Sequence, residues 1–231
     1  MIQLFPWTLD AQRKRLLKRA PAGPLRDFLK VAPPEKNTPL KDTPILSVDV
    51  ETTGFDYQLD QILSIGFVAI DKLSIPLASS SHQIIRLERN LDDANVIIHK
   101  ITDSAKNAGV PAEQAIGKLL ENLAGKVLLA HYAKTEVNFI RQSCLALYGL
   151  APVFPVIDTL QIAAQRMTRE QRQAKRKELR LFRLRERYGL PEYAAHNALG
   201  DALSAAELFL AEVPNLPDGP STRLSKILVR P

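Results

Sequence analysis

Two carboxylates stand two positions apart in the stretch SVDVETTG, residues 47–54. Side chains alternate along a β-strand, so Asp49 and Glu51 point to one face, with Cα atoms about 6–7 Å apart. Carboxylates so close repel each other and lose hydration. Protonation, an arginine partner or a divalent cation would relieve this repulsion and desolvation. Thr52, Thr53 and Gly54 follow with hydroxyls, backbone N–H groups and a residue without Cβ, where a ligand can approach closely. The alternative is a polar strand end that faces solvent.

A third carboxylate, Asp201, lies on the apolar face of the last predicted helix. Residues three before, four after and seven after it share this face, and they are Ala198, Ala205 and Leu208. Asp201 is therefore expected to point inward, where a carboxylate needs a partner. A divalent metal shared with the two strand carboxylates is such a partner, since hard cations bind carboxylate oxygens.

His196 and Glu136 are weaker candidates when each is taken alone. His196 precedes Asp201 by five residues, about 140° around a helix, so we place it before the helix start. Beside a metal-bound water it would be a general base, and otherwise a surface histidine. Glu136 falls in the first turn of another predicted helix, where a glutamate also suits the helix N-terminus.

The net charge of +6 is unevenly distributed along the 231 residues. Residues 1–42 hold 9 Lys/Arg and 4 Asp/Glu, and residues 166–187 hold 10 and 3, which leaves 12 and 18 for the rest of the chain. An acidic body with two basic segments favours a magnesium-binding protein that gathers a polyanion. The second segment, at +7, is too one-sided for internal pairing, so we predict phosphate contacts, with a solvated helix face as the alternative.

Composition indicates an ordinary globular protein in a reducing compartment. The chain has no apolar run of eighteen residues, and its basic N-terminus lacks the apolar core of a secretory signal. Cys144 is the only cysteine, so no internal disulfide forms, which fits the cytoplasm, and its helical spacing predicts a core position.

Three parts are predicted along the chain. Residues 1–44 form a basic helical extension with a Pro-rich linker, residues 45–212 the main domain, and residues 213–231 an irregular tail. Three strands come first in the domain, and helices then alternate with strands, which indicates an α/β fold with a mixed sheet flanked by helices. The predicted strands cover 45–50, 62–70, 82–87, 126–130 and 153–157. One predicted helix begins at Pro111, and the other helical regions cover about 135–148, 159–187 and 197–212.

Three motifs in this order resemble those of the DEDDh 3′–5′ exonuclease superfamily, which includes the proofreading ε subunit of bacterial replicative DNA polymerase, RNase T and oligoribonuclease. The motifs are VDVETTG, LLAHYAKTEVNFI and HNALGDA, and the segments IIHKIT (97–102) and VIDTLQIA (156–163) are weaker matches. The resemblance covers about residues 45–212. It implies a ribonuclease H-like fold with a mixed five-stranded sheet, and hydrolysis of nucleic acid from the 3′ end.

The resemblance also implies roles for individual residues. Asp49, Glu51, Glu136 and Asp201 would bind two Mg²⁺ or Mn²⁺ ions, and His196 would be the general base. The backbone of Thr52, Thr53 and Gly54 would hold the 3′-terminal nucleotide. Phe55 and His131 are two further candidate substrate-binding residues. The family usually has Asp where this chain has Glu136, and frequently Asn where it has Tyr132.

The leading hypothesis is therefore a DNA exonuclease that releases nucleoside 5′-monophosphates, with single-stranded DNA as the expected substrate. Two alternatives are an exonuclease of RNA or short oligonucleotides and a catalytically weak, polymerase-associated nucleic-acid-binding scaffold. Phe55 or Tyr57 could stack on an unpaired 3′ end, or serve only in the core or in a surface loop. Residues 1–44 are expected to dock on their own domain or on a protein partner, and no membrane contact is expected.

Overall fold

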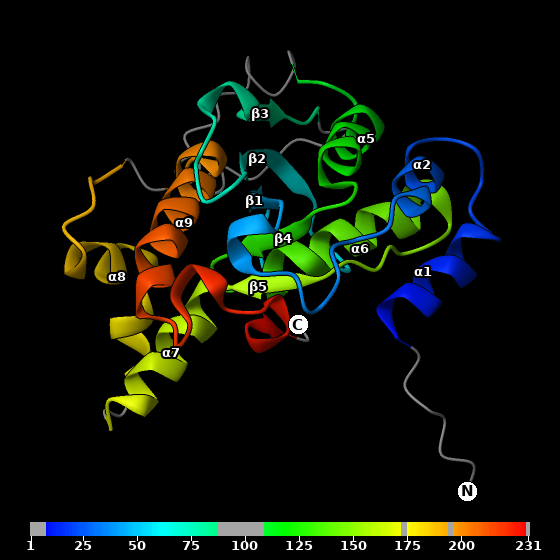
Figure 1. Ribbon diagram of the computed structural model, residues 1–231. Coiled ribbons are helices and arrows are strands. Elements are labelled where there is room, and N and C mark those ends of the chain that lie inside the picture. The colour runs from blue at the N-terminus through cyan, green and yellow to red at the C-terminus, as the bar shows by residue number, and fades with distance from the viewer. Residues whose placement is uncertain (1–7, 87–108, 172–174, 194–195, 230–231) are drawn as a thin grey trace, which may run out of the picture.

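The computed structural model describes residues 8–86, 109–171, 175–193 and 196–229. Its centre is a mixed sheet with the strand order β3-β2-β1-β4-β5-β6 (Figure 1). The first three strands form an antiparallel meander, β4 and β5 run parallel to β1, and β6 is antiparallel to β5. The strands are β1 (Ile45–Thr52), β2 (Ile62–Ile70), β3 (Ser81–Ile84), β4 (Val127–Ala130), β5 (Val156–Asp158) and β6 (Leu228–Val229).

The sheet has six strands rather than the five that we predicted. The additional strand β6 lies in the tail that we expected to be irregular, and it pairs Leu228 with Ile157 and Val229 with Val156. Two residues are too few to show an alternating pattern. The strand exists because the tail reaches β5, which is a tertiary contact.

Helices cover both faces of the sheet, as the α/β prediction requires (Figure 1). On one face, α5 and α6 pack on the apolar side chains of β1, among them Val48 and Val50. On the other face lies α9, against which α7 and α8 pack. The helices are α5 (Ala112–Leu123), α6 (Lys134–Tyr148), α7 (Thr159–Arg169), α8 (Leu181–Arg187) and α9 (Ala198–Glu212). The basic stretch predicted as one helical region is thus two α-helices, with a short 3-10 helix (Arg176–Leu179) between them.

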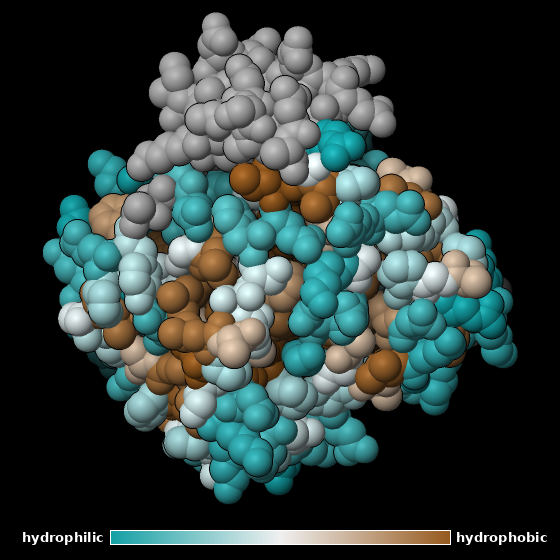
Figure 2. Space-filling view, turned by 90° about the horizontal axis from the view of Figure 1, so that it is seen from above, coloured by the Kyte–Doolittle hydropathy of each residue, from teal (hydrophilic) through white to brown (hydrophobic). Residues whose placement is uncertain are grey.

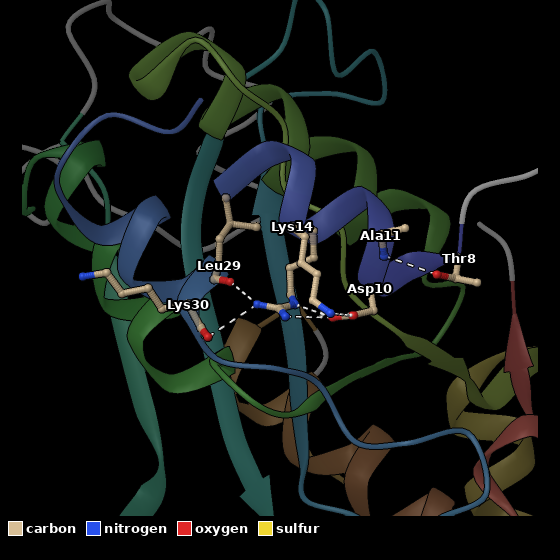
Figure 3. A network of polar contacts seen from close by, with 7 residues as sticks. Thr8, Asp10, Ala11, Lys14, Leu29 and Lys30 are labelled. Carbon is tan, nitrogen blue, oxygen red and sulfur yellow. Dashed lines mark hydrogen bonds and ion pairs between the residues drawn. The ribbon is translucent and has the colours of Figure 1, made fainter. Parts of the chain in front are cut away.

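The N-terminal extension docks on its own domain. Helix α2 (Pro24–Lys30) buries Leu25, Phe28 and Leu29 in the core shared with α5. Helix α1 (Leu9–Leu17) is tied to α2 by the buried Arg13, which donates hydrogen bonds to the carbonyl of Leu29 and to Asp10 (Figure 3). Arg13 is thus occupied within the protein.

Seen from above, the described surface is largely hydrophilic, with hydrophobic patches between the polar side chains (Figure 2). In the part of the chain that the structure describes, no helix combines the length and the apolar character that crossing a bilayer requires.

Candidate active site

Three carboxylates from distant parts of the chain meet at one place. Asp49 and Glu51 project from β1, and Asp201 projects from the first turn of α9. One oxygen from each of the three lies within 4.8 Å of the others. Strand alternation and the inward face of the last helix predicted this convergence. Glu51 is buried, and the other two are half-buried.

Gly66 on β2 allows α9 to lie directly on the sheet. It pairs with Asp49 across the β1–β2 ladder. A Cβ added at Gly66 would lie 2.1 Å from the carbonyl carbon of Ala198 and 2.1 Å from the nitrogen of Leu199, in the first turn of α9. Only a glycine permits this approach, which places Asp201, two residues further along the helix, beside β1. No local sequence pattern indicates this role of Gly66, because the atoms that it accommodates are distant in the chain.

The chain turns sharply into α9 at His196. His196 has a left-handed backbone with φ of 64°, and Asn197 caps the helix by accepting a hydrogen bond from the N–H of Gly200 at 3.0 Å. The backbone N–H of His196 donates to Oδ2 of Asp201 at 3.1 Å. The imidazole is exposed. His196 therefore lies just before the helix, as its spacing predicted, and is tied to a carboxylate of the cluster.

Glu136 is close to the three carboxylates without being one of the three mutually adjacent groups. It is buried in the first turn of α6, and its Oε2 has no hydrogen-bond partner among the described residues. Burial, together with the Asp158 and Glu51 carboxylates, raises the pKa of Glu136 to about 8. Burial and the Glu136, Asp201 and Glu51 carboxylates likewise raise the pKa of Asp49 well above its ordinary value.

This group of acids fits a divalent cation. Its donors are all carboxylate oxygens, which hard cations such as Mg²⁺ and Mn²⁺ prefer. Carboxylates crowded in a poorly solvated place disfavour their own ionised forms, and a cation between them removes that penalty. The orphaned oxygen of Glu136 points to the same conclusion, because buried polar atoms normally have partners.

Asp158 holds the turn that carries Glu136. Its carboxylate accepts hydrogen bonds from the N–H groups of Tyr132 at 2.9 Å, Ala133 at 3.2 Å and Leu160 at 3.0 Å. Tyr132 has a φ of 65°, so the chain enters α6 through a left-handed residue that these bonds support. Asp158 falls within the weaker segment VIDTLQIA, for which the sequence predicts no role. An aspartate directly before a helical pattern is the N-cap signal that could have identified it.

His131 lines the site with both ring nitrogens occupied by the protein. Nε2 lies 2.9 Å from the carbonyl oxygen of Leu179 and therefore donates, while Nδ1 accepts from the Thr159 hydroxyl at 2.8 Å. Burial lowers the pKa of His131 to about 4, so the ring is neutral. The ring joins the end of β4 to the start of α7 and to the segment that precedes α8.

The turn after β1 is organised by Asp60, a residue that was not among the predicted site residues. Asp60 accepts hydrogen bonds from the Thr53 hydroxyl at 2.9 Å and from the N–H of Asp56 at 2.9 Å. Gly54 lets this carboxylate approach, since a Cβ there would lie 2.4 Å from Oδ2 of Asp60. The hydroxyl of Thr52 donates to the carbonyl of Gly54 at 2.6 Å. Phe55 is 99% exposed beside this turn.

A cleft of about 560 Å³ opens beside the carboxylates. Its lining includes Asp49, Asp201 and His131 on one side, and Phe182 and Tyr193 from α8 and the segment after it. These two rings are 55% and 41% exposed. A cavity of about 610 Å³ between α1, α6 and β6 is lined by no carboxylate and so lacks this chemistry.

The basic segment 166–187 is neutralised internally more than we predicted. Two of its arginines reach carboxylates on α9, and two pair with carboxylates of the segment itself. These pairs are Arg166–Glu212 at 3.5 Å, Arg185–Glu207 at 2.7 Å, Arg183–Glu186 at 2.8 Å and Arg187–Glu178 at 3.3 Å. The expectation that one-sided charge excludes internal pairing was therefore wrong for Arg183 and Arg187. The other two partners lie on α9, which is distant in sequence, so the charge count of the segment did not indicate them.

Comparison with known proteins identifies the class of this fold and site. A family model described as "Exonuclease" matches residues 46–209, and the chain belongs to that family. This membership confirms the predicted resemblance. The segment 97–102, a weaker part of that resemblance, lies outside the described residues.

Curated relatives include proteins named as DNA polymerase III or as like its epsilon subunit, and they are much longer than this chain. It is 28% identical over 232 residues to a PolC-type DNA polymerase III of Thermotoga petrophila, covering 98% of this chain and 16% of that protein. It is 32% identical over 183 residues to a DNA polymerase III subunit epsilon-like protein of Rhodobacter capsulatus, covering 78% of this chain and 25% of the relative. The chain thus spans between a sixth and a quarter of these relatives.

Solved structures with the same fold are also nucleases. The nuclease domain of 3′hExo, a DEDDh family member bound to rAMP, has a TM-score of 0.65 and 18% identity, covering 86% of this chain and 99% of that domain. A zinc-bound complex of Escherichia coli exonuclease I with single-stranded DNA has a TM-score of 0.64 and 15% identity, covering 76% of this chain and 41% of the enzyme. At these identities the comparison establishes the ribonuclease H-like fold.

Proposed function

We propose that the chain is a metal-dependent 3′→5′ exonuclease that removes nucleoside 5′-monophosphates from the 3′ end of DNA, with single-stranded DNA as the favoured substrate. The observation that carries the proposal is the convergence of Asp49, Glu51 and Asp201 within 4.8 Å, next to an exposed histidine. Membership of the exonuclease family supports the reaction class. A relative of this fold that binds single-stranded DNA supports the substrate.

Asp49, Glu51 and Asp201 would hold one Mg²⁺ or Mn²⁺ ion, and Glu136 together with Asp49 would hold a second. When bound, two such ions stabilise the charge that develops on a phosphate during displacement and lower the pKa of a water. The longer side chain of Glu136, compared with the family's usual aspartate, still offers a carboxylate from the first turn of α6.

The chain's own groups would perform the remaining tasks. An imidazole nitrogen of His196 would accept the proton of the attacking water, which its exposure beside Asp201 permits. The turn Thr52–Gly54 and the ring of Phe55 would hold the terminal nucleotide, because that turn directly follows the strand with two of the carboxylates. His131 would contribute to substrate binding indirectly, because its hydrogen bond to the carbonyl of Leu179 holds the wall of the cleft that it lines.

Contacts to the rest of a nucleic acid strand and to other proteins belong to the same proposal. Exposed cations of the basic segment, such as Lys177 and Arg180, would contact phosphates without reading the sequence. Residues 1–44 would offer a surface for a protein partner, as the polymerase-associated relatives suggest.

The test is digestion of end-labelled oligonucleotides by the purified chain with Mg²⁺ or Mn²⁺. Single-stranded DNA should shorten in single-nucleotide steps from its 3′ end. Asp201→Asn, which keeps the side-chain size, should reduce turnover by about 100-fold or more and weaken Mn²⁺ binding, since it removes a ligand charge. The matched control is Glu121→Gln, an exposed acid on α5 paired with Lys118, which should change neither quantity.

The same assay decides between the alternatives. Preferential digestion of RNA would show that RNA, and not DNA, is the substrate class. The structure of the same fold bound to rAMP is the reason to include RNA in the assay. Absence of digestion with either metal on every substrate, or full activity in Asp201→Asn, would refute the proposed function.

A further inference from the structure

Three elements meet at the guanidinium of Arg185, which lines the same cleft as Asp49 and Asp201. Arg185 is buried, and it donates from α8 to the carbonyl of Ser204 on α9 at 2.7 Å. It also donates to the carbonyl of Pro191 at 2.6 Å and to the carboxylate of Glu207 at 2.7 Å. One side chain thus joins α8, α9 and the connection between them.

Tyr193 extends this junction toward His196. Its hydroxyl donates to the second oxygen of Glu207 at 2.9 Å, and the guanidinium lies 5.0 Å from the centre of its ring. Two residues separate Tyr193 from His196. On the other side, His196 is fixed to α9 by its N–H bond to Asp201. The connection is therefore anchored on both sides of the histidine.

We propose that Arg185 is the positioning residue that sets the place of His196 relative to the carboxylate cluster. The inference rests on the proposed function for the role of His196, but the anchoring itself does not. Ser204 lies three residues after Asp201 and faces the same cleft, so Arg185 attaches the connection to the turn of α9 next to the one that carries Asp201. A flexible connection would leave the imidazole without a fixed direction of approach, and misplacement by about 1 Å costs about 100-fold in rate.

The contact pattern requires an arginine. Its planar fork reaches two carbonyls and a carboxylate at once and stacks on the Tyr193 ring, which a lysine ammonium does not reproduce. Removing the cation leaves Glu207 without its ion pair. Of the contacts described above, the connection then keeps the tyrosine hydroxyl bond to Glu207 and the His196 N–H bond to Asp201.

The first test follows the anchoring by hydrogen exchange of the metal-free protein. In Arg185→Met, the backbone amides of Leu190 and His196, which donate to the carbonyl of Arg185 and to Asp201, should exchange about tenfold faster or more, because a buried charge-assisted hydrogen-bond set no longer opposes local opening. Amides of β1 and β4 should not change. Arg183→Met removes a cation from the same helix whose partner is the exposed Glu186, so it should leave these amides unchanged. Tyr193→Phe, which removes a single bond at a half-exposed residue, should give a smaller acceleration.

Unaltered exchange in both Arg185→Met and Tyr193→Phe would overturn the proposal, whether or not the protein is a nuclease. The second test is a double-mutant cycle on oligonucleotide digestion. Arg185→Met should lower kcat about tenfold or more with KM within about twofold, and in a His196→Ala background it should cost less than about twofold, because the histidine that it positions is gone. Equal losses in both backgrounds would overturn the proposal. A wild-type chain without exonuclease activity would refute the proposed function instead, and the exchange result would still decide the anchoring.

Discussion

Replacing Gly66 with alanine would place a methyl group inside the backbone of α9. The added Cβ would lie 2.1 Å from atoms of Ala198 and Leu199, whereas ordinary van der Waals contact begins at 3.4 Å. The atoms in the way belong to the backbone, so no side-chain rotation relieves the clash. The start of α9 must therefore retreat by about 1.3 Å, the difference between these two distances.

This retreat carries Asp201 away from its two partners on β1. The three carboxylates lie within 4.8 Å, and a shift of about 1 Å is enough to spoil a shared metal site. We expect turnover to fall about 100-fold, which corresponds to about 2.7 kcal/mol in the barrier. Overpacking should also cost about 1–3 kcal/mol of stability.

The assay for Gly66→Ala combines 3′-end digestion, Mn²⁺ titration by calorimetry, and thermal unfolding. Gly117→Ala is the matched control, because its Cβ would meet only the side chain of Pro24 at 3.2 Å, and alanine favours its position in α5. We expect the control to keep its activity and Mn²⁺ affinity. A folded Gly66→Ala protein with wild-type turnover and Mn²⁺ affinity would refute the reasoning that close approach of α9 to β2 sets the site.

Three further predictions concern the residues around this cluster. Between pH 6.5 and about 4, His131 is protonated in the unfolded chain but stays neutral in the folded protein, so it lowers the free energy of unfolding by about 3 kcal/mol as pH falls through that range. Urea unfolding of His131→Gln should lack this loss, and parallel pH profiles for the two proteins would contradict the prediction. Glu136→Gln should lower turnover about tenfold or more while Glu136→Asp keeps measurable activity, compared by initial rates over a range of Mn²⁺ concentrations; unchanged rates in both variants would show that Glu136 is no ligand. Asp158→Asn should destabilise the protein by about 1–3 kcal/mol in thermal unfolding, because an amide nitrogen cannot accept the N–H bonds that the carboxylate accepts; an unchanged midpoint would argue against the clamp.

The core of the fold follows closely from local patterns. Five apolar residues share one face of the predicted helix after Pro111, and all of them are buried: Ala115, Ile116, Leu119, Leu120 and Leu123. Cys144 is buried as its spacing predicted. The apolar run over residues 62–70 has strand length, and it forms β2 with the predicted bounds. Element ends were predicted less well, since the last residues of β1 are held by pairing with β2.

Local periodicity determined which chemistry this chain can perform. Alternation along β1 put Asp49 and Glu51 on one face, and the apolar face of the last helix turned Asp201 inward, since both features repeat within a few residues. Tertiary structure alone decided how those groups meet. Three contacts join residues far apart in the chain: the packing of α9 against Gly66, the hydrogen bond from Arg185 to Ser204 on α9, and the pairing of the tail with β5. No short-range pattern encodes such contacts, because they depend on how separate elements are packed together.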